Sequence, residues 1–536
     1  MDFNYILSVI FLLPLLGSLI VYFAGSRKED SAKLLSLVIS GVVLVVTIVA
    51  AWAFLETTDF LDTNLVKGLF PNILSDGTAN NNGAAGFSVV LVDQITWVES
   101  IGITYFLGID GLSAPLMVLT SFVTMAAIFA SPKKMERGPL YYSLILLLET
   151  GIFGTFMALD FFLFFVSWEL VLVPMFFLIG IWGGPKREYA AIYFFIYTHL
   201  ASLVLLLGVV GMWVLNVGEV GFDNASFSML DIAVTLQGLP IDLIMRLIFG
   251  AMFFGFIVKV PTAPFHTWLP LAHVEAPSPI SMVLAGLLLK MGGYGLIRIN
   301  FIMLPQVFEE YALAIALLGI LSLFWGGFVA LRQVDLKRLV AYSSIAHMGM
   351  VLFGAAISAA TGRPEGLIGA QYMMIAHGLI SPMLFNICGV VQHTANTRDI
   401  PKLRGLTQKM PNLAGLLVFA SMASLGLPGL AGFVSEFFTF LAAFGWNQNF
   451  FGVDMPWLAF VAIIGIVVTV AYYLWMLQRV VWGQASETVE AAHPPERWEY
   501  TSLFMLAVPI LVLGILPMIL INPIWGTFEA IAALTS

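Results

Sequence analysis

The chain has 536 residues, of which 60% are hydrophobic and only 10% are charged, and its formal net charge is −9. A soluble protein of this size carries about 25% charged residues, so the composition indicates a polytopic membrane protein. The negative net charge argues against nucleic acid as a partner. The single cysteine, Cys388, excludes an internal disulfide and an iron–sulfur cluster held by several thiolates.

The first apolar run, residues 5–23, is too long for the core of a signal peptide and lacks a clean cleavage site. We therefore expect a retained membrane helix there. Further windows of about 20 apolar residues follow along the sequence, and together they predict an all-α protein with about fourteen transmembrane helices. The predicted spans lie near residues 4–24, 33–55, 111–131, 139–158, 160–182, 190–214, 243–272, 278–300, 309–331, 338–360, 366–392, 411–445, 456–478 and 501–521.

Two of these spans are over-long, and each contains an internal helix breaker. In FGFIVKVPTAPFHTWLP (254–270), an apolar run reaches Lys259 and then meets Pro261 and Pro264. Because proline has no backbone N–H, a regular helix cannot continue through this stretch.

The second interrupted span contains LGLPGLAGFVSEFF, residues 425–438. Pro428 and Gly429 break the helix shortly before Glu436. Broken helices near the middle of the membrane are typical of transporters, which use them to line a polar path.

A weak internal repeat accompanies the breaks. FIYTHLASLVLL (195–206) resembles MIAHGLISPMLF (374–385), and each stretch places a histidine shortly before a serine. Together with one broken span in each half, this predicts two inverted five-helix repeats. The expected division is residues 1–131 for N-terminal helices with an external loop, 139–300 for the first repeat, 309–478 for the second, and 479–536 for a loop and the C-terminal helix.

The basic residues predict the orientation. Threading the spans places most of the 23 basic residues in loops on one side, from Arg27, Lys28 and Lys133 to Arg497, whereas Lys67 lies in a loop on the other side. The positive-inside rule makes the first side cytoplasmic or its topological equivalent, so both termini are expected opposite the cytoplasm. We expect a bacterial plasma membrane or an equivalent energy-transducing membrane.

Five charged residues fall inside predicted spans and away from the span ends, where a charge costs roughly 2.5–3.5 kcal/mol on insertion scales. A lysine releases its proton more easily when buried and holds it more firmly beside a carboxylate, so such groups can form a proton relay. Structural alternatives are an ion pair between Lys259 and Glu169 that only holds helices together, and a Glu436 carboxylate that only caps the helix after the break. The five residues are Glu149, Glu169, Lys259, Lys290 and Glu436.

Histidines suit the intermediate steps of a relay because their unperturbed pKa is about 6.5. His347 and His377 lie in consecutive spans between Lys290 and Glu436 in the sequence, and His199 is a further candidate. A lone histidine in an apolar helix is more often simply hydrogen-bonded. His266 and His273 flank the loop after the first broken helix and suit proton uptake or capping. The sequence contains no motif for a metal, haem, nucleotide or flavin site, so we expect no metal and no cofactor in this chain.

Four blocks resemble the antiporter-like membrane subunits of respiratory complex I, an NADH:quinone oxidoreductase. The closest resemblance is to subunit M, also called chain 4, and the corresponding photosynthetic subunit is similar. The resemblance extends over roughly residues 100–480. The blocks are FFLFFVSWELVLVPMFFLIGIWG (161–183), KVPTAPFHTWLPLAHVEAPSPISMVLAGLLLKMGGYGLIR (259–298), DLKRLVAYSSIAHMGMV (335–351) and LPGLAGFVSEF (427–437).

The resemblance implies roles residue by residue. Glu169 and Lys259 match a pair on the fifth and seventh helices, and Lys290 matches the lysine of the central axis. A glutamate at position 436 favours subunit M over its sister subunits, which usually carry lysine there, and many relatives have a charged residue where Leu271 stands. The connecting histidines of the family match His347 and His377.

The resemblance predicts a proton-translocating membrane subunit without a redox centre of its own. Flavin, iron–sulfur clusters and quinone are expected in partner subunits, and sister antiporter-like subunits are expected beside it in the membrane. Two alternatives stay open at this point: a subunit of a multi-subunit cation/proton antiporter, and the membrane arm of a hydrogenase or ferredoxin-driven complex.

Overall fold

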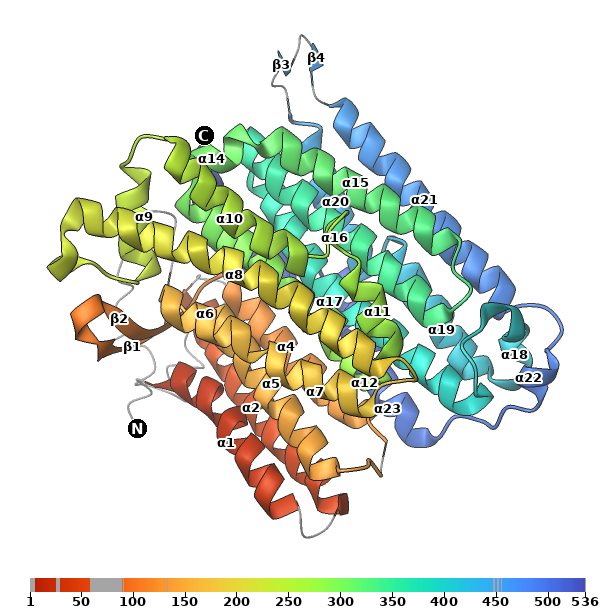
Figure 1. Cartoon of the computed structure of the whole chain (residues 1–536). Coiled ribbons are helices and arrows are strands. Elements are labelled where there is room, and N and C mark those ends of the chain that lie inside the picture. Colours follow the sequence, from red (N-terminus) through yellow and green to blue (C-terminus); the bar gives the residue numbers. More distant parts are fainter. Residues whose placement is uncertain are drawn as a thin grey trace.

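The computed structural model describes residues 5–25, 29–57, 89, 91–132, 134–446, 449–450, 453–454 and 456–535. Helices make up most of this part of the protein and run side by side in one elongated bundle (Figure 1). The first half contributes α1 (Ile6–Gly25), α2 (Glu29–Thr57), α4 (Ser113–Ala130), α5 (Gly138–Met157), α6 (Phe161–Leu170), α7 (Leu172–Trp182), α8 (Arg187–Val220), α9 (Met229–Gln237), α10 (Leu243–Lys259), α11 (Trp268–Glu275), α12 (Ser278–Val283) and α13 (Leu289–Gly295).

The second half continues the same architecture. Two short π-helical turns, Leu284–Leu288 and Leu296–Phe301, flank α13, so that residues 278–301 form one continuous span. The remaining helices are α14 (Pro305–Glu310), α15 (Ala312–Leu331), α16 (Leu336–Thr361), α17 (Pro364–Ala395), α18 (Leu406–Lys409), α19 (Pro411–Ser424), α20 (Ala431–Ala443), α21 (Trp457–Val480), α22 (Glu487–Glu490), α23 (Arg497–Ile515) and α24 (Met518–Ala532).

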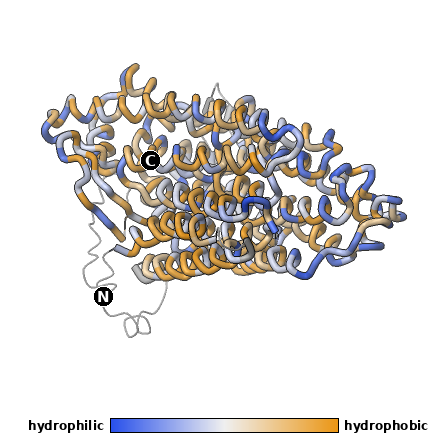
Figure 2. The backbone as a smooth tube through the Cα atoms, turned by 60° about the horizontal axis from the view of Figure 1, so that its bottom comes forward, coloured by the Kyte–Doolittle hydropathy of each residue, from blue (hydrophilic) through white to orange (hydrophobic). Residues whose placement is uncertain are grey.

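Thirteen helices among the described residues are long and apolar enough to cross a membrane. Twelve of them coincide with predicted spans, and the two interrupted spans appear as the pairs α10/α11 and α19/α20. Apolar residues cover the helices along most of their length, whereas hydrophilic stretches gather toward the two ends of the bundle (Figure 2). The prediction of an all-α polytopic membrane protein is confirmed.

The prediction of a single last span over residues 501–521 is wrong. The structure has α23, which ends at Ile515, and then a separate helix α24. Pro517 explains the interruption, because proline lacks an N–H and disfavours helical geometry in the residue before it. α24 buries Ile521, Ile524 and Phe528 along one face, the spacing of an amphipathic helix.

Both predicted interruptions are present in the backbone. α10 ends at Lys259, and residues 260–267 form turns before α11 begins. α19 ends at Ser424, and the backbone then passes through Gly426 and Gly429, whose φ angles of +80° and +92° favour glycine. Each break therefore follows from residues that cannot continue a helix.

The loops segregate to opposite ends of the bundle. At one end, backbone bridges join Leu107 to Ala158 and Asp160 to Ser228. The small hairpin of β1 (Leu91–Val98) and β2 (Ile103–Ile109) lies there, and Phe227 N donates to Gly102 O across 3.0 Å. A second hairpin pairs β3 (Asn449–Phe450) with β4 (Val453–Asp454).

The opposite end holds basic loops that contact one another. Asp335 bridges to Asp399, Arg398 Nη1 donates to Val274 O at 3.0 Å, and Lys337 Nζ donates to Ala276 O at 2.5 Å. Four basic residues used to predict the orientation lie outside the described residues: Arg27, Lys28, Lys67 and Lys133. The inverted repeats and the four-part division of the sequence stay predictions.

Four spans are almost entirely enclosed by the rest of the protein. The buried share is 100% for residues 278–301, 94% for α16 and for α17, and 89% for α5. By contrast, α2 and α23 are only 28% buried. Glu149, Lys290, His347 and His377 all lie on the enclosed spans, so these polar groups sit in the middle of the bundle.

Candidate functional site

Glu169 on α6 contacts a histidine. Its Oε2 atom lies 2.8 Å from Nδ1 of His199 on α8. The described residues show no direct ion pair between Glu169 and Lys259, because the carboxylate contacts His199 instead, and their functional pairing stays a prediction. α6 and α8 present the carboxylate and the imidazole to each other, whereas the end of α10 carries Lys259 toward the adjacent residue, Trp168.

Lys259 lies against an aromatic ring. Its Nζ atom is 4.1 Å from the centre of the Trp168 ring, and within the described structure it has no hydrogen-bond partner. A cation over the face of a tryptophan is attracted to the negative potential of the ring. Trp168 is held in place because its Nε1–H donates to Ser202 Oγ at 2.9 Å. α8 thus supplies a partner to each of two consecutive residues of α6.

Lys290 lies at the centre of the bundle and is fully buried. Its Nζ atom lies 2.6 Å from Nδ1 of His377 and donates to Ala285 O at 2.5 Å. Ala285 belongs to a π-helical turn, and such turns disturb the ordinary helix ladder and often occur at functional sites. The lysine is therefore solvated by one carbonyl and one imidazole.

Close backbone contacts bring the neighbouring helices to Lys290. A Cβ atom at Gly286 would lie only 2.8 Å from Pro382 of α17 and 3.3 Å from Gly378 O. Similarly, a Cβ at Gly292 would lie 2.9 Å from Val260 N, directly after Lys259. Glycine at these two positions lets both α17 and the broken end of α10 approach the helix of Lys290.

The two predicted histidines lie next to each other. The ring centres of His347 and His377 are 5.6 Å apart. His377 Nε2 lies 2.9 Å from Ser381 Oγ, and His347 Nε2 lies 3.0 Å from Ser424 Oγ at the end of α19. Titratable side chains therefore lie one beside the next from Lys290 past both histidines to the second helix break.

Glu436 closes this series. A small cavity, with room for about one water molecule, is lined by His347, His377, Ser424 and Glu436 among others. Gly426 lies against the carboxylate, so closely that a side chain at this position would overlap it. A glycine in the break is thus required for the acid to reach the cavity.

The structure does not support the alternative that Glu436 caps the helix after the break. α20 begins at Ala431, so Glu436 is already inside the helix, and no side chain caps its first turn. Among the described residues, Glu436 Oε1 is buried without a hydrogen-bond partner. The acid therefore faces the cavity and not the free N–H groups.

The comparisons with known proteins agree over nearly the whole sequence. The family model described as "NADH:quinone oxidoreductase/Mrp antiporter, TM" matches residues 158–461, and that described as "NADH-ubiquinone oxidoreductase chain 4, amino terminus" matches residues 72–166. The chain belongs to this family. It is an antiporter-like membrane subunit of the NADH:quinone oxidoreductase type.

Two relatives illustrate the range of the family. F(420)H(2) dehydrogenase subunit M of Methanosarcina mazei is 38% identical over 452 residues, which are 83% of this chain and 87% of the relative. An NAD(P)H-quinone oxidoreductase chain 4 of Synechococcus elongatus is 41% identical over 448 residues, 83% of this chain and 80% of the relative.

Solved structures share the fold. A subunit of respiratory complex I from Thermus thermophilus superimposes with a TM-score of 0.82 at 25% identity, covering 99% of this chain and 100% of that one. A subunit of the Mrp complex from Dietzia sp. gives a TM-score of 0.79 at 24% identity, covering 98% of this chain and 52% of that one. Both of these subunits belong to multi-subunit membrane complexes. The antiporter-like subunit described here is likewise a member of a multi-subunit complex.

Some predicted residues of this antiporter-like subunit stand apart from the series. Both carboxylate oxygens of Glu149 are buried without a partner in the described structure, and the neighbouring Thr150 donates to its own helix at Leu146 O. His266 Nε2 accepts from Trp325 Nε1 at 3.0 Å. The ring of His273 stacks on Phe385, with centres 4.3 Å apart.

Sequence reasoning missed a buried ion pair. Arg298 Nη2 lies 2.6 Å from Asp110 Oδ2, and each side chain is only 1% exposed. Arg298 Nε also donates to the hydroxyl of Tyr294 at 3.1 Å. Arg298 lies near the end of the predicted span 278–300 and Asp110 just before the predicted span 111–131, although the four-residue spacing of Lys290, Tyr294 and Arg298 on one helix was a usable signal.

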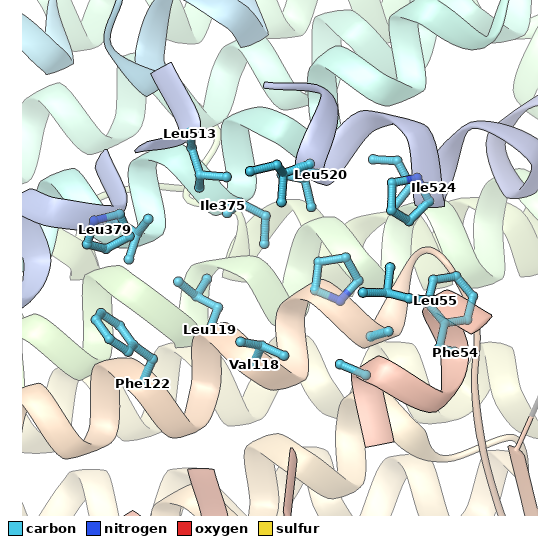
Figure 3. Close-up of a pocket in the computed structure, with 16 residues that line it drawn as sticks. Phe54, Leu55, Val118, Leu119, Phe122, Ile375, Leu379, Leu513, Leu520 and Ile524 are labelled. Carbon is cyan, nitrogen blue, oxygen red and sulfur yellow. The ribbon is translucent and has the colours of Figure 1, made fainter. Parts of the chain in front are cut away.

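An apolar cavity lies away from the charged residues. Its volume is about 270 Å³, and Figure 3 shows Phe54, Val118, Ile375, Leu513 and Ile524 around it. The cavity is enclosed by α2, α4, α17, α23 and α24, and all of its lining residues are apolar. It therefore offers no group that can carry a proton.

Proposed function

We propose that this protein translocates protons across the membrane as a subunit of a complex I-type NADH:quinone oxidoreductase. The observation that carries the proposal is the series of contacts from Lys290 through His377 and His347 to the cavity of Glu436. Each member is a side chain that can bind and release a proton, and each lies in or beside an enclosed span.

The first step of the relay follows from the contact between Lys290 and His377. A charged Lys290 donates its hydrogen bond to the lone pair of His377 Nδ1. When the proton moves along this bond, a neutral amine and an imidazolium remain, and no charge is created or lost. A histidine is suited to this step because its two protonation states lie close in free energy near neutral pH.

The second step takes the proton from the histidines to Glu436. The small cavity between these residues has polar groups on both sides and room for about one water molecule, as a proton transfer through water requires. Glu436 then releases the proton toward the end of the bundle that we assign opposite the cytoplasm. The basic loops around Arg398 and Lys337 favour that orientation, with both termini on the non-cytoplasmic side.

Energy for the relay is expected from other subunits. Flavin, iron–sulfur clusters and quinone would reside in partner subunits, and sister antiporter-like subunits would lie beside this one in a bacterial plasma membrane or an equivalent one. The names of the relatives support a quinone-reducing partner, with NAD(P)H or reduced F420 as the electron donor.

The second candidate is a cation/proton antiporter without redox partners. The likeness in fold to the Mrp subunit favours it, and the matching family model covers both kinds of protein. Purification of the tagged protein from its native membrane separates the two. Flavin and iron–sulfur subunits in the same particle support the proposed function, whereas a particle composed only of antiporter subunits contradicts it.

Proton movement is tested directly with Lys290→Ala in membrane vesicles. We expect quinone-coupled proton uptake to fall at least about a hundredfold, the lower end of the range for a positioned proton-transferring side chain. Lys402→Ala is the matched control, because Lys402 is exposed and pairs only with Asp399 in the described structure. Equal proton uptake by the two variants contradicts the proposal.

A further inference from the structure

A series of hydroxyl groups leads away from His347. Ser424 Oγ donates to the hydroxyl of Tyr473 at 2.7 Å, and that hydroxyl donates to Ser343 Oγ at 3.1 Å. Ser343 Oγ in turn donates to Val340 O at 2.7 Å. All three hydroxyl residues are buried, and they come from α16, α19 and α21.

The direction of this hydroxyl series is fixed at its far end. A backbone carbonyl only accepts hydrogen bonds, and each hydroxyl has a single proton to donate. The hydroxyl of Ser343 therefore donates its hydrogen bond to Val340 O. In the same way, the hydroxyl of Tyr473 donates to Ser343, and that of Ser424 donates to Tyr473. Ser424 can therefore only accept a hydrogen bond from His347.

The consequence concerns the tautomer of His347. Since Ser424 Oγ lies 3.0 Å from Nε2 and can only accept there, Nε2 must carry the hydrogen. Nδ1 is then the nitrogen with the free lone pair. The hydroxyl series ends on a carbonyl that cannot hold a proton, so it is not a conducting path.

His377 has a parallel arrangement. Its Nε2 atom contacts Ser381 Oγ, which lies 3.5 Å from Ser344 Oγ, and Ser344 donates to Val340 O at 3.2 Å. Both histidines are thus oriented through serines toward the same carbonyl. His377 presents Nδ1 to Lys290, in agreement with a hydrogen on Nε2.

We propose that Ser424, Tyr473 and Ser343 are positioning residues that hold His347 with its hydrogen on Nε2 and its proton-accepting lone pair on Nδ1. The proposal rests on the proposed function, in which His347 carries a proton. A proton that arrives forms an N–H bond at Nδ1 and gives an imidazolium, and the same bond breaks when the proton leaves for the Glu436 cavity. The Nε2–H bond stays intact throughout.

Tyr473→Phe tests the orientation in the assembled complex. Without the tyrosine hydroxyl, Ser424 can turn and donate to Nε2, which stabilises the wrong neutral tautomer of His347. We expect proton pumping to fall about fivefold, the size of one neutral hydrogen bond. The pH profile of pumping should move toward acidic pH, because the neutral ring gains a stabilising contact that the protonated ring lacks.

The matched control is Tyr472→Phe. Tyr472 is the adjacent buried tyrosine on α21, and its hydroxyl lies near Ser343 but forms no hydrogen bond of ordinary geometry in the described structure. This variant should pump like the wild type with an unchanged pH profile. Ser424→Ala should reproduce the defect, and Ser424→Thr, which keeps a hydroxyl, should restore most of the pumping.

The outcomes separate orientation from packing and from the relay itself. Wild-type pumping and an unchanged pH profile in both Tyr473→Phe and Ser424→Ala would overturn the proposal. Equal damage in Tyr472→Phe, or in Ser424→Thr, would also overturn it, because packing would then explain the effect. His347→Gln is the separate test of the relay: wild-type pumping there refutes the proposed path, whatever the hydroxyl variants do. Native gels of each variant establish assembly.

Discussion

The two helix breaks present opposite charges to different surroundings. The break after α10 leaves Lys259 over the face of Trp168, with no hydrogen-bond partner among the described residues. The break between α19 and α20 leaves Glu436 at a small polar cavity shared with two histidines. Polar and titratable side chains gather around the cavity at the second break, whereas the charged group at the first break lies against an aromatic ring.

This difference indicates two tasks. Around the second break, a proton can pass between neighbouring groups without large side-chain movements. At the first break, Lys259 must leave the ring before it can exchange a proton with Glu169, which instead contacts His199. We therefore expect the first region to control the timing of transfer and the second to conduct.

Glu436→Gln should have the largest effect, because it removes the last proton carrier of the conducting region. We expect proton pumping to fall at least about a hundredfold, whereas Glu436→Asp should retain part of it. Proton uptake by vesicles and native gels of the complex measure activity and assembly together. Intact pumping in an assembled Glu436→Gln complex would refute its role as a carrier.

Glu169→Gln should be almost as severe, because it removes the only carboxylate that contacts His199 in the described structure. Quinone reduction should fall together with pumping in a tightly coupled complex. The complex should still assemble, since glutamine can keep one hydrogen bond to the imidazole. If quinone reduction stayed fast while pumping was lost, Glu169 would be needed to conduct protons but not to couple proton movement to quinone reduction.

Lys259→Arg should also impair pumping, by a smaller factor than the two acid variants. Arginine preserves the positive charge over Trp168 but cannot release its proton at any accessible pH. Proton uptake at several pH values is the measurement. Full activity of Lys259→Arg would show that the residue provides only a fixed positive charge. The claim that the first break controls the timing of proton transfer would then be contradicted.

Asp110→Asn should affect stability and leave the proton-to-electron ratio unchanged. Arg298 has a fixed, fully buried partner, unlike Lys259, and removal of one partner of a buried pair costs about 3–5 kcal/mol. Thermal unfolding of the purified complex should show the loss. A changed proton-to-electron ratio with unchanged stability would place the pair in the proton path.

Trp168→Phe should have the smallest effect. Phenylalanine keeps an aromatic face beneath Lys259 but loses the hydrogen bond from Nε1 to Ser202 Oγ. We expect pumping to fall about fivefold or less, the size of one neutral hydrogen bond. A larger loss of pumping in Trp168→Phe than in Lys259→Arg would mean that the position of the aromatic ring, and not proton release by the lysine, limits proton transfer at the first break.

Much of the fold was predictable because apolar windows and helix breakers act locally. The interruptions at Pro261 and Pro428 follow directly from the missing N–H of proline. α24 was missed because Asn522, Pro523 and Gly526 lower its apolar content, and because only one face of it is buried.

The contacts of the candidate site were less predictable. Whether Glu169 reaches His199 or Lys259 depends on the rotation of α8 and on the turn after α10, which no periodicity specifies. The hydroxyl series joins Ser343, Ser424 and Tyr473, which are far apart in the sequence and meet only through packing. Asp110 and Arg298 are separated by 188 residues.

The central claim is that protons pass from Lys290 through His377 toward Glu436, and His377→Gln tests it most directly. Glutamine can still accept the hydrogen bond from Lys290 Nζ but cannot carry a proton. His393→Gln, at the basic end of the bundle where His393 contacts Glu499, is the control. The measurement is the number of protons moved per electron by the purified complex in vesicles. We predict a lower ratio for His377→Gln and a wild-type ratio for His393→Gln, and a wild-type ratio in an assembled His377→Gln complex would contradict the account.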